Sequence, residues 1–273
     1  MSLYTLAGLV FGLALFLVAI VLSTDNYLMF LSVESFIMVL GGTLANAFIS
    51  YQGRYVVKAL KDVARVFSHA RINEDILLNE SRRVINWATI VSTEGILALE
   101  QKLKTKEAHD HFLQYGIKLV VDGRKPHEVR ELMTNTLSSK FQRATTQVVI
   151  LRNMAASAPA FGMVGTLVGL IIMLDGLGDD AGGLGAGLAI ALLTTLYGVM
   201  FARFIFQPAA DKTLQREEIE RFRNQLMLEG FVMLAEERRP GFVEARINSF
   251  LAPEDVAKLP KRKRVGGDGG GSK

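Results

Sequence analysis

The chain has 273 residues, half of them hydrophobic although 21% are charged, and its formal net charge at pH 7 is +4. This combination is typical of a membrane protein whose long apolar segments alternate with charged blocks. The basic residues form no stripe that would bind nucleic acid, and the absence of cysteine excludes disulfides, thiolate metal sites and a cysteine nucleophile.

Two apolar segments occupy the first 50 residues. Met1–Leu22 lacks the basic n-region and the small-residue cleavage site of a signal peptide, so we expect an uncleaved transmembrane helix. A turn at Ser23–Asn26 leads to a second segment, Tyr27–Ser50, which is long enough to cross a bilayer. We therefore assign residues 1–50 to transmembrane helices 1 and 2.

A charged block over residues 51–151 predicts a cytoplasmic helical domain. Gly95 interrupts its second helix only mildly, and Asn73 or the acids after it are the expected cap of that helix. The sequence VDGRKP predicts a turn, with Pro126 opening the helix that follows. Apolar residues recur at helical spacing in four segments of the block, Arg54–Ala70, Ile76–Leu103, His109–Val121 and Pro126–Arg152.

Residues 152–208 predict transmembrane helices 3 and 4. They hold two apolar helices, Met154–Leu174 and Leu184–Phe206, joined by a short acidic, glycine-rich loop. A charged cytoplasmic helix is expected over residues 209–239. A looser, basic and glycine-rich tail follows over residues 240–273, and its KRKR sequence fits either binding to anionic lipid head groups or a solvated tail.

The distribution of basic residues predicts the topology. Residues 51–150 carry 16 Lys and Arg, whereas none occurs before Arg54 or between Arg152 and Arg203. The two short loops between the apolar segments carry only acids. By the positive-inside rule, the fold class is an all-α integral membrane protein with four transmembrane helices, both termini in the cytoplasm and a helical cytoplasmic domain between spans 2 and 3.

Polar residues inside the third and fourth spans form the candidate functional site. Pro159 and Thr166 lie with two glycines at spacings of three or four residues, so they share one helical face. That face combines a hydroxyl with a carbonyl freed by proline. Thr194 and Thr195 give a comparable patch in the fourth span, and we interpret both patches as an ion pathway. Alternatively, these threonines only bond carbonyls one turn back while the glycines permit close packing.

A carboxylate is missing from both of these spans. A cation crossing a bilayer needs a charged or titratable site near mid-depth. Glu34, near the outer end of the second span, is the sole acid within the predicted spans. If the protein conducts ions, the carboxylate must therefore come from another chain.

No enzyme active site is expected. The four histidines are His69, His109, His111 and His127, all in the predicted cytoplasmic part. Because residues two apart on a helix point to different faces, His109 and His111 favour solvated side chains over a metal site. Neither a nucleotide-binding glycine loop nor a serine or cysteine nucleophile motif is present.

Five stretches carry a resemblance to a known family: SVESFIMVLGGTLA, GILALE, YGIKLVVDG, APAFGMVGTLVGL and ALLTTLYGVMFARFIFQPAADK. Through them the chain closely resembles the A subunit of the bacterial flagellar stator, the MotA/PomA family, up to about Glu236. The last two stretches are specific to the superfamily that also holds the TolQ and ExbB proteins. Those relatives have three spans and an outward N-terminus, so four predicted spans favour the stator branch.

The resemblance implies an ion-driven rotary unit of the bacterial inner membrane. A pentameric ring of A subunits would surround the helices of two B subunits, which supply the ion-binding aspartate, and would push the rotor protein FliG. No cofactor is implied beyond the transported cation. Pro159 and Pro208 match the family's two functional prolines. Because Thr166, Thr194 and Thr195 resemble sodium-driven members, sodium is favoured over the proton.

One departure from the family concerns the rotor contact. Family members usually carry a basic residue shortly before GILALE, where this chain has Ser92 and Thr93. The resemblance therefore leaves two expectations, a rotor contact through other charges or a rotor that is not flagellar. A non-flagellar, TolQ/ExbB-like energy-transducing subunit and a passive membrane scaffold remain the alternatives. The candidate rotor-contact residues are Glu100, Arg82, Arg83, Lys102 and Lys104.

Overall fold

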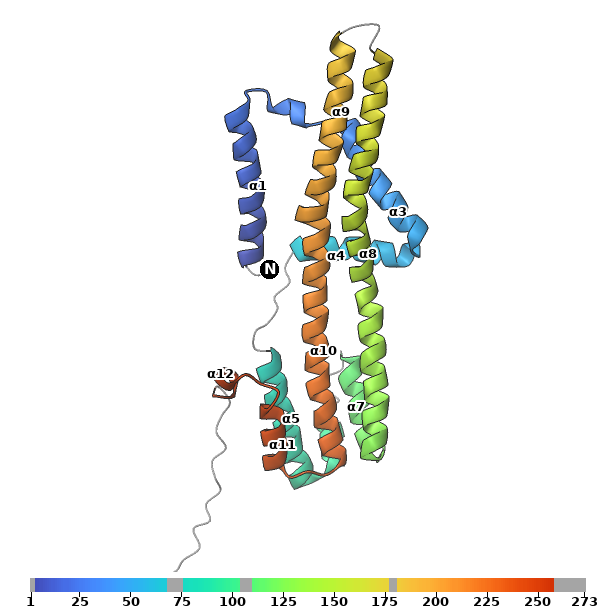
Figure 1. Cartoon of the computed structure of the whole chain (residues 1–273). Helices are drawn as coiled ribbons and strands as arrows, with labels where there is room; N and C mark the ends of the chain where they lie inside the picture. The colour runs from blue at the N-terminus through green and yellow to red at the C-terminus, as the bar shows by residue number, and fades with distance from the viewer. Residues whose placement is uncertain (1–2, 68–75, 104–109, 177–180, 258–273) are drawn as a thin grey trace, which may run out of the picture. The chain divides into compact units, whose positions relative to one another are not determined.

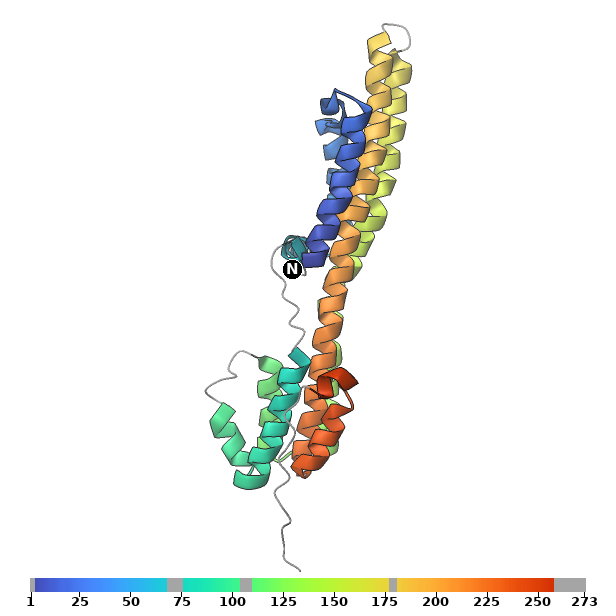
Figure 2. The same ribbon diagram turned by 90° about the vertical axis from the view of Figure 1, so that its left-hand side faces the viewer.

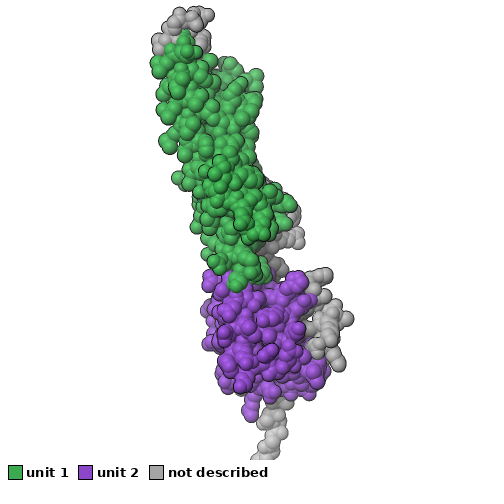
Figure 3. All heavy atoms as spheres, turned by 90° about the vertical axis from the view of Figure 1, so that its right-hand side faces the viewer, with its two compact units in different colours: residues 1–72, 139–220 green, residues 73–138, 221–273 purple. Residues whose placement is uncertain are grey.

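The computed structural model describes residues 3–67, 76–103, 110–176 and 181–257, and all regular secondary structure within them is helical. The chain divides into two compact units, coloured separately in Figure 3. Unit 1 comprises residues 1–72 and 139–220, and unit 2 comprises residues 73–138 and 221–273. Two long helices, α8 and α10, contribute residues to both units.

Unit 1 begins with α1, Leu3–Ser23, an apolar helix of 21 residues. The second predicted span then differs from expectation at its start, because Tyr27–Phe30 is a 3-10 turn (η1). A continuous helical run begins only at Val33, where the Ser32 hydroxyl caps it by accepting the Ser35 amide at 3.1 Å. This run consists of α2, Val33–Phe36, a π-helical turn η2, Ile37–Gly41, and α3, Gly42–Ser50.

Tyr197 bonds the backbone where the 3-10 turn Tyr27–Phe30 ends and the continuous helical run has not yet begun. Its hydroxyl donates a hydrogen bond of 2.6 Å to the carbonyl of Phe30 and accepts one of 3.0 Å from the amide of Ser32. The backbone groups that a helix would have paired locally are thus bonded by a side chain from a distant helix of unit 1.

The helix α8, Pro126–Asp175, runs for 50 residues and merges two helices that the sequence analysis expected to be separate. Likewise α9, Ala181–Met200, continues through a π-helical stretch η4, Phe201–Phe206, into α10, Gln207–Ala235. Neither junction contains a glycine that would end a helix, so the helical backbone continues through the change from apolar to charged sequence, with a π-helical stretch at the second junction.

The π-helical stretch η4 lies directly before Pro208. The amide of Gln207 donates to the carbonyl of Ala202, five residues earlier, as a π-helix requires. Pro208 has no amide hydrogen, and in a regular turn its ring would clash with the carbonyl four residues earlier. The wider turn places a proline inside the helix without breaking it.

Three helical stretches are long and apolar enough to cross a membrane, Tyr27–Ser50, Pro126–Asp175 and Leu184–Ala235. The described part of α1 adds a shorter apolar helix, Val10–Ser23. In unit 1, α8 and α9 lie side by side along their apolar lengths (Figures 1 and 2).

The helix α4, Gly53–Phe67, lies crosswise to α8 and α10 within unit 1 (Figure 1). Val56 and Ala59 point into a core that also contains Leu151 and Ala209, and all four are fully buried. One apolar face of α4 therefore packs inward, while its basic residues Arg54, Lys58 and Lys61 remain exposed.

Unit 2 is a helical bundle. It contains α5, Ile76–Glu94, α6, Ile96–Leu103, α7, His111–Val121, the ends of α8 and α10, and α11, Pro240–Asn248, with a short α12, Pro253–Val256. The expected cap at Asn73 and the KRKR tail lie outside the described residues.

Two expectations for unit 2 were wrong. Gly95 does not interrupt a helix mildly but ends α5, because its φ of +87° is left-handed and only glycine adopts it readily. The segment after Arg239 is not loose either, since Val243 and Ile247 of α11 are fully buried against the bundle. The predicted VDGRKP turn is confirmed, with Gly123 at φ +69° and Pro126 at the start of α8.

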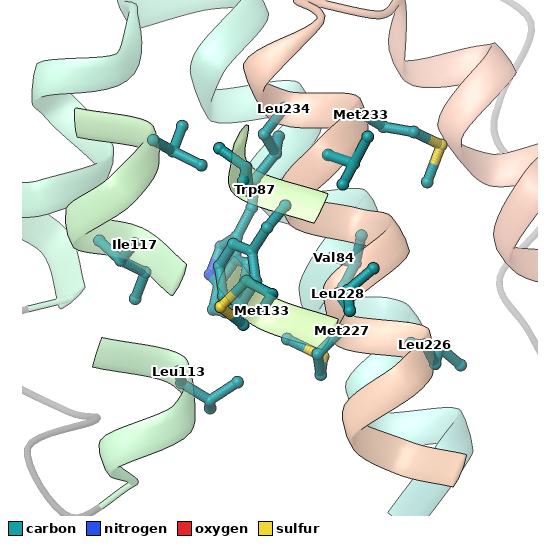
Figure 4. Close-up of a cluster of buried hydrophobic side chains, with 14 of the residues drawn as sticks. Val84, Trp87, Leu113, Ile117, Met133, Leu226, Met227, Leu228, Met233 and Leu234 are labelled. Carbon is teal, nitrogen blue, oxygen red and sulfur yellow. The ribbon is translucent and has the colours of Figure 1, made fainter. Parts of the chain in front are cut away.

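The core of unit 2 is built around Trp87, which stacks on Phe231 with ring centroids 5.6 Å apart. Figure 4 shows Trp87 and Met133 among the aliphatic side chains of α7 and α10. Gly116 faces Phe231 so closely that a side chain there would overlap the ring. Glycine at this position therefore lets α7 approach α10.

An ion-pair cluster lies beside this core. Arg223 donates to the Glu80 carboxylate at 2.8 Å and to the Asp110 carboxylate at 2.6 Å. Burial alone would raise the pKa of Asp110, but the hydrogen bond and charge of Arg223 outweigh burial, and the amides of Phe112 and Leu113 add to them, so the pKa is lowered. Asp110 is also the N-cap of α7, which links the ion pairs to the start of that helix.

Candidate ion pathway on the α8–α9 pair

Glycines allow the backbones of α8 and α9 to touch. A Cβ atom added at Gly169 would lie 2.6 Å from the Ala191 nitrogen and 2.6 Å from the Gly187 oxygen. Similarly, a Cβ at Gly198 would lie 2.7 Å from the Ala158 oxygen and 3.1 Å from the Cα of Pro159. Approach this close is typical of small-residue interfaces in membranes, where packing rather than hydrophobicity holds helices together.

The face predicted to be shared by Pro159, Gly162, Thr166 and Gly169 is the face that meets α9. Thr166 lies at its centre. The hydroxyl of Thr166 is 2.6 Å from the Thr195 hydroxyl and 3.1 Å from the carbonyl oxygen of Ala191. The two helices therefore present a hydroxyl pair beside a carbonyl, at the site that the sequence indicated.

The two hydroxyls of this pair keep most of their capacity to accept. Each threonine hydroxyl has one hydrogen and two lone pairs. The Thr166 hydroxyl can donate to Thr195 or to the carbonyl of Gly162 or Ala191, and the Thr195 hydroxyl can donate to Thr166 or to the carbonyl of Ala191. At most one lone pair of the two hydroxyls is therefore occupied. Because Thr195 is exposed and Thr166 half-buried in the single chain, these oxygens can face a ligand or a neighbouring helix.

Thr194 is placed differently from Thr195. It is fully buried, and its hydroxyl donates to the carbonyls of Ile190 and Ala191, 3.0 Å away in each case. Its side chain fills the space opposite Gly165, where an added Cβ would lie 2.5 Å from the Thr194 Cβ. In this structure Thr194 packs the helix pair.

Pro159 lies inside α8 beside α9 and is half-buried. Because proline has no amide hydrogen, the carbonyl of Ala155 lacks the amide hydrogen bond that a regular helix would supply. Pro208 is also half-buried, in the first turn of α10 after η4. Both prolines therefore lie where unit 1 departs from regular α-helical hydrogen bonding.

Carboxylates are sparse around this site. Within the described parts of the predicted spans, Glu34 is the only acidic residue. It is exposed in the first turn of α2, where the Ser32 hydroxyl donates to it at 3.0 Å. The predicted spans that carry the Thr166–Thr195 hydroxyl pair, Met154–Leu174 and Leu184–Phe206, thus contain no carboxylate.

The candidate rotor-contact residues belong to unit 2. Arg82 is exposed on α5, and Arg83 forms an ion pair of 2.7 Å with Glu80. Glu100 and Lys102 lie in α6, where the structure describes their backbone but not their side chains, and Lys104 lies outside the described residues.

Sequence analysis missed a second polar contact within unit 1. The amide nitrogen of Asn46 on α3 donates to the Asn153 side-chain oxygen at 3.2 Å and to the Ser157 hydroxyl at 2.8 Å. Amide side chains in apolar helices are the signal that would have indicated this contact. It holds α3 against α8 on the side of α8 away from Thr166.

Comparison with known proteins places the chain in a family. The MotA/TolQ/ExbB proton channel family matches residues 104–225. The chemotaxis protein PomA of Vibrio alginolyticus is 32% identical over 252 residues, covering 92% of this chain and 96% of PomA. The uncharacterized protein YtxD of Bacillus subtilis is 31% identical over 263 residues, covering 96% of this chain and 94% of YtxD.

A solved structure shows the same fold. The C. jejuni MotAB structure superposes with a TM-score of 0.84 at 25% identity, covering 96% of this chain and 100% of the matched chain. The chain is therefore a multi-pass membrane protein with three helices of membrane-spanning length among its described residues. Because relatives above 30% identity align over more than nine-tenths of both sequences, this chain belongs to the MotA/TolQ/ExbB proton channel family, alongside PomA and the motility A proteins.

Proposed function

We propose that this chain is the A subunit of a flagellar motor stator that couples cation flow to rotation. The kinship with PomA and with the C. jejuni MotAB structure supports this proposal. The observation that carries it is the Thr166–Thr195 hydroxyl pair, with Thr195 exposed and Thr166 half-buried, on two closely packed apolar spans that contain no carboxylate. A conducting unit of this kind needs a partner, and a B-type subunit with a membrane aspartate supplies it.

The proposed topology has four spans in the bacterial inner membrane. Basic residues concentrate in residues 51–151 and in the segment after Arg203, which supports a cytoplasmic location for both under the positive-inside rule. The membrane part is then residues 1–50 and 152–208, and unit 2 belongs to the cytoplasmic part. The acidic loops face outward.

The Thr166–Thr195 pair serves as the ion-handling surface of this chain. Hydroxyl and carbonyl oxygens replace part of the hydration shell of a hard cation such as sodium, whereas a proton needs only a titrating group. With the B subunit's aspartate opposite, these oxygens complete a sodium site, and sodium is the favoured ion. Thr194 supports the site by packing the helix pair.

Rotation follows if cation binding and release shift a ring of these chains around the B helices. Five copies are proposed, as the family resemblance implies. Pro159 and the π-helical turn before Pro208 are the places in unit 1 where helix hydrogen bonding is already relaxed, so they are suited to bending. Charges of unit 2, with Glu100 and Arg82 foremost, would transmit the motion to FliG.

A non-flagellar machine is the second candidate. Ser92 and Thr93 stand exposed at the end of α5, where flagellar relatives usually have a basic residue, and the Thr93 hydroxyl donates to its own helix at the Thr89 carbonyl, 2.9 Å away. If the rotor is not FliG, the ion pathway is unchanged and only the cytoplasmic partner differs.

The proposed ion pathway is tested with the chain reconstituted with its B-type partner in vesicles. Thr195→Val keeps the side-chain shape but removes the hydroxyl, and we expect at least about a tenfold rise in the sodium concentration that half-saturates uptake, because a hydrogen bond or ligand to a charge is worth roughly 1.5–3 kcal/mol. Thr195→Ser keeps the hydroxyl and is the matched control. Equal sodium dependence in both variants would overturn the assignment.

A further inference from the structure

A basic cavity lies within unit 1 where α4 crosses α8 and α10, apart from the hydroxyl pair. Its volume is about 330 Å³, at the small end of the range of ligand sites. Its charged lining consists of four basic residues, Lys58, Lys61, Arg65 and Arg216, and two acids, Asp62 and Glu217. The net formal charge of the lining is thus two positive, from four cations and two anions.

The two acids of the cavity organise the arginines. Asp62 is only 6% exposed, and its carboxylate oxygen lies 3.5 Å from an Arg65 nitrogen and 3.8 Å from an Arg216 nitrogen. Glu217 accepts from its neighbour Arg216 at 2.9 Å. The carboxylates therefore fix the two guanidinium groups without neutralising the cavity.

The lysines supply the remaining positive charge. The Lys58 ammonium stands 5.9 Å from the Tyr55 ring, and Lys61 makes no ion pair with any residue the structure describes. Two ammonium groups and the outward donors of Arg65, whose side chain is 67% exposed, face the same space. This is the donor set that phosphate oxygens bind.

The depth of α4 relates this cavity to a membrane surface. Val56 and Ala59 of α4 pack in one core with Leu151 of α8. At 1.5 Å per residue, Leu151 lies about 20 Å along α8 from the middle of the apolar stretch Met154–Leu174. A bilayer with its head groups is about 40–45 Å thick, so the Val56–Ala59 part of α4 lies at head-group depth, given the membrane placement proposed above. Gln147, which lines the cavity, lies about 26 Å along α8 from the same point, so the cavity is at the cytoplasmic edge of the head groups.

We propose that this cavity binds the phosphate of an anionic phospholipid of the cytoplasmic leaflet. That leaflet is rich in anionic head groups, and α4 presents its basic side chains at their level. The Asp62 oxygen lies 3.5 Å from an Arg65 nitrogen and 3.8 Å from an Arg216 nitrogen, so it holds both guanidinium groups at the same cavity. The lipid anchors α4, and through the shared core it steadies the helices that carry Pro208 and the proposed ion pathway.

The test is lipid binding by the full chain with its B-type partner in detergent. Short-chain phosphatidylglycerol, the matching phosphatidylcholine and inorganic phosphate are each titrated, and the thermal midpoint is followed by far-UV circular dichroism. We expect saturable stabilisation by phosphatidylglycerol alone. Equal stabilisation by phosphatidylcholine would overturn the proposal and indicate unspecific lipid binding. Equal stabilisation by inorganic phosphate would overturn it and indicate a soluble anion as the ligand.

Two charge-matched variants locate the site. Lys61→Gln with Arg65→Gln should weaken phosphatidylglycerol binding at least about tenfold, because charge-assisted hydrogen bonds to the phosphate are lost. Arg124→Gln with Lys118→Gln removes the same charge from exposed positions of unit 2, outside the cavity, and should bind like the native chain. Unchanged binding in the cavity variant, or an equal loss in the control, refutes the site. If the double variant does not fold, Lys61→Gln alone is used for the same measurement. The readout is lipid binding, so it does not depend on whether the chain conducts ions.

Discussion

Replacing Gly169 with alanine tests whether α8 and α9 really meet backbone to backbone. The added Cβ would lie 2.6 Å from the Ala191 nitrogen, whereas ordinary contact begins at 3.4 Å. The difference, 3.4 minus 2.6, means that the helices must separate locally by 0.8 Å. The Thr166–Ala191 hydrogen bond, now 3.1 Å, would then stretch to 3.9 Å and be lost.

A matched variant isolates this effect. An alanine in place of a helical glycine gains up to about 1 kcal/mol from helix propensity, and overpacking costs about 1–3 kcal/mol. A Cβ at Gly185 on α9 has no atom within 4 Å, so Gly185→Ala should gain helix propensity without a steric clash. We expect Gly169→Ala to be about 1–3 kcal/mol less stable than Gly185→Ala.

The assay is unfolding of the purified chain in mild detergent by titration with sodium dodecyl sulfate, followed by far-UV circular dichroism. Swimming or ion uptake, measured at equal membrane levels, gives a second readout for the stretched Thr166 bond. If Gly169→Ala is as stable as Gly185→Ala and conducts normally, the two helices do not pack at this point and the pathway geometry fails.

Three further outcomes are expected. Arg223→Met removes the ion-pair partner of Asp110 and leaves Glu80 paired only with Arg83, which should cost about 3–5 kcal/mol, read from the fluorescence of Trp87, the single tryptophan; no loss would show that the cluster is not formed. Because the pKa of Asp110 is lowered in the folded state, its carboxylate stabilises the fold fully above the unfolded pKa near pH 4, and this stabilisation is lost as pH falls through the folded pKa. Asp110→Asn should therefore make the loss of stability at acid pH less steep. Tyr197→Phe leaves the Phe30 carbonyl and the Ser32 amide without their partner and should destabilise the chain by about 1–3 kcal/mol in the detergent titration, whereas an unchanged midpoint would contradict the bond.

The sequence predicted which residues of α8 share a face, but not which of the threonines are buried in the α8–α9 contact. Spacing along one helix placed Pro159 and Thr166 on a shared face, and that face does meet α9. Thr194 and Thr195 are adjacent in sequence, so only the register between the two helices decides that Thr194 is buried and Thr195 exposed. Register depends on contacts between glycines such as Gly169 and Gly187, which a single sequence does not reveal.

Helix boundaries were predicted less well for a related reason. Hydropathy changes sharply near Arg152 and Phe206, and this change suggested helix ends that α8 and the α9–α10 run do not have. Apolar or charged character decides what surrounds a helix, whereas its end depends on backbone conformation. Gly95, at φ +87°, shows the opposite case, because one left-handed residue ends α5 where the apolar spacing continues.

The most direct test of the proposed function is swimming speed against sodium concentration at fixed pH and membrane potential, in the host deleted for this gene and restored with its B-type partner. The proposed sodium pathway predicts that swimming is lost in the deletion and recovers saturably with sodium. It also predicts that Thr195→Val needs more sodium than Thr195→Ser. Swimming that recovers fully without sodium, with the two variants alike, would contradict the sodium site at Thr166 and Thr195.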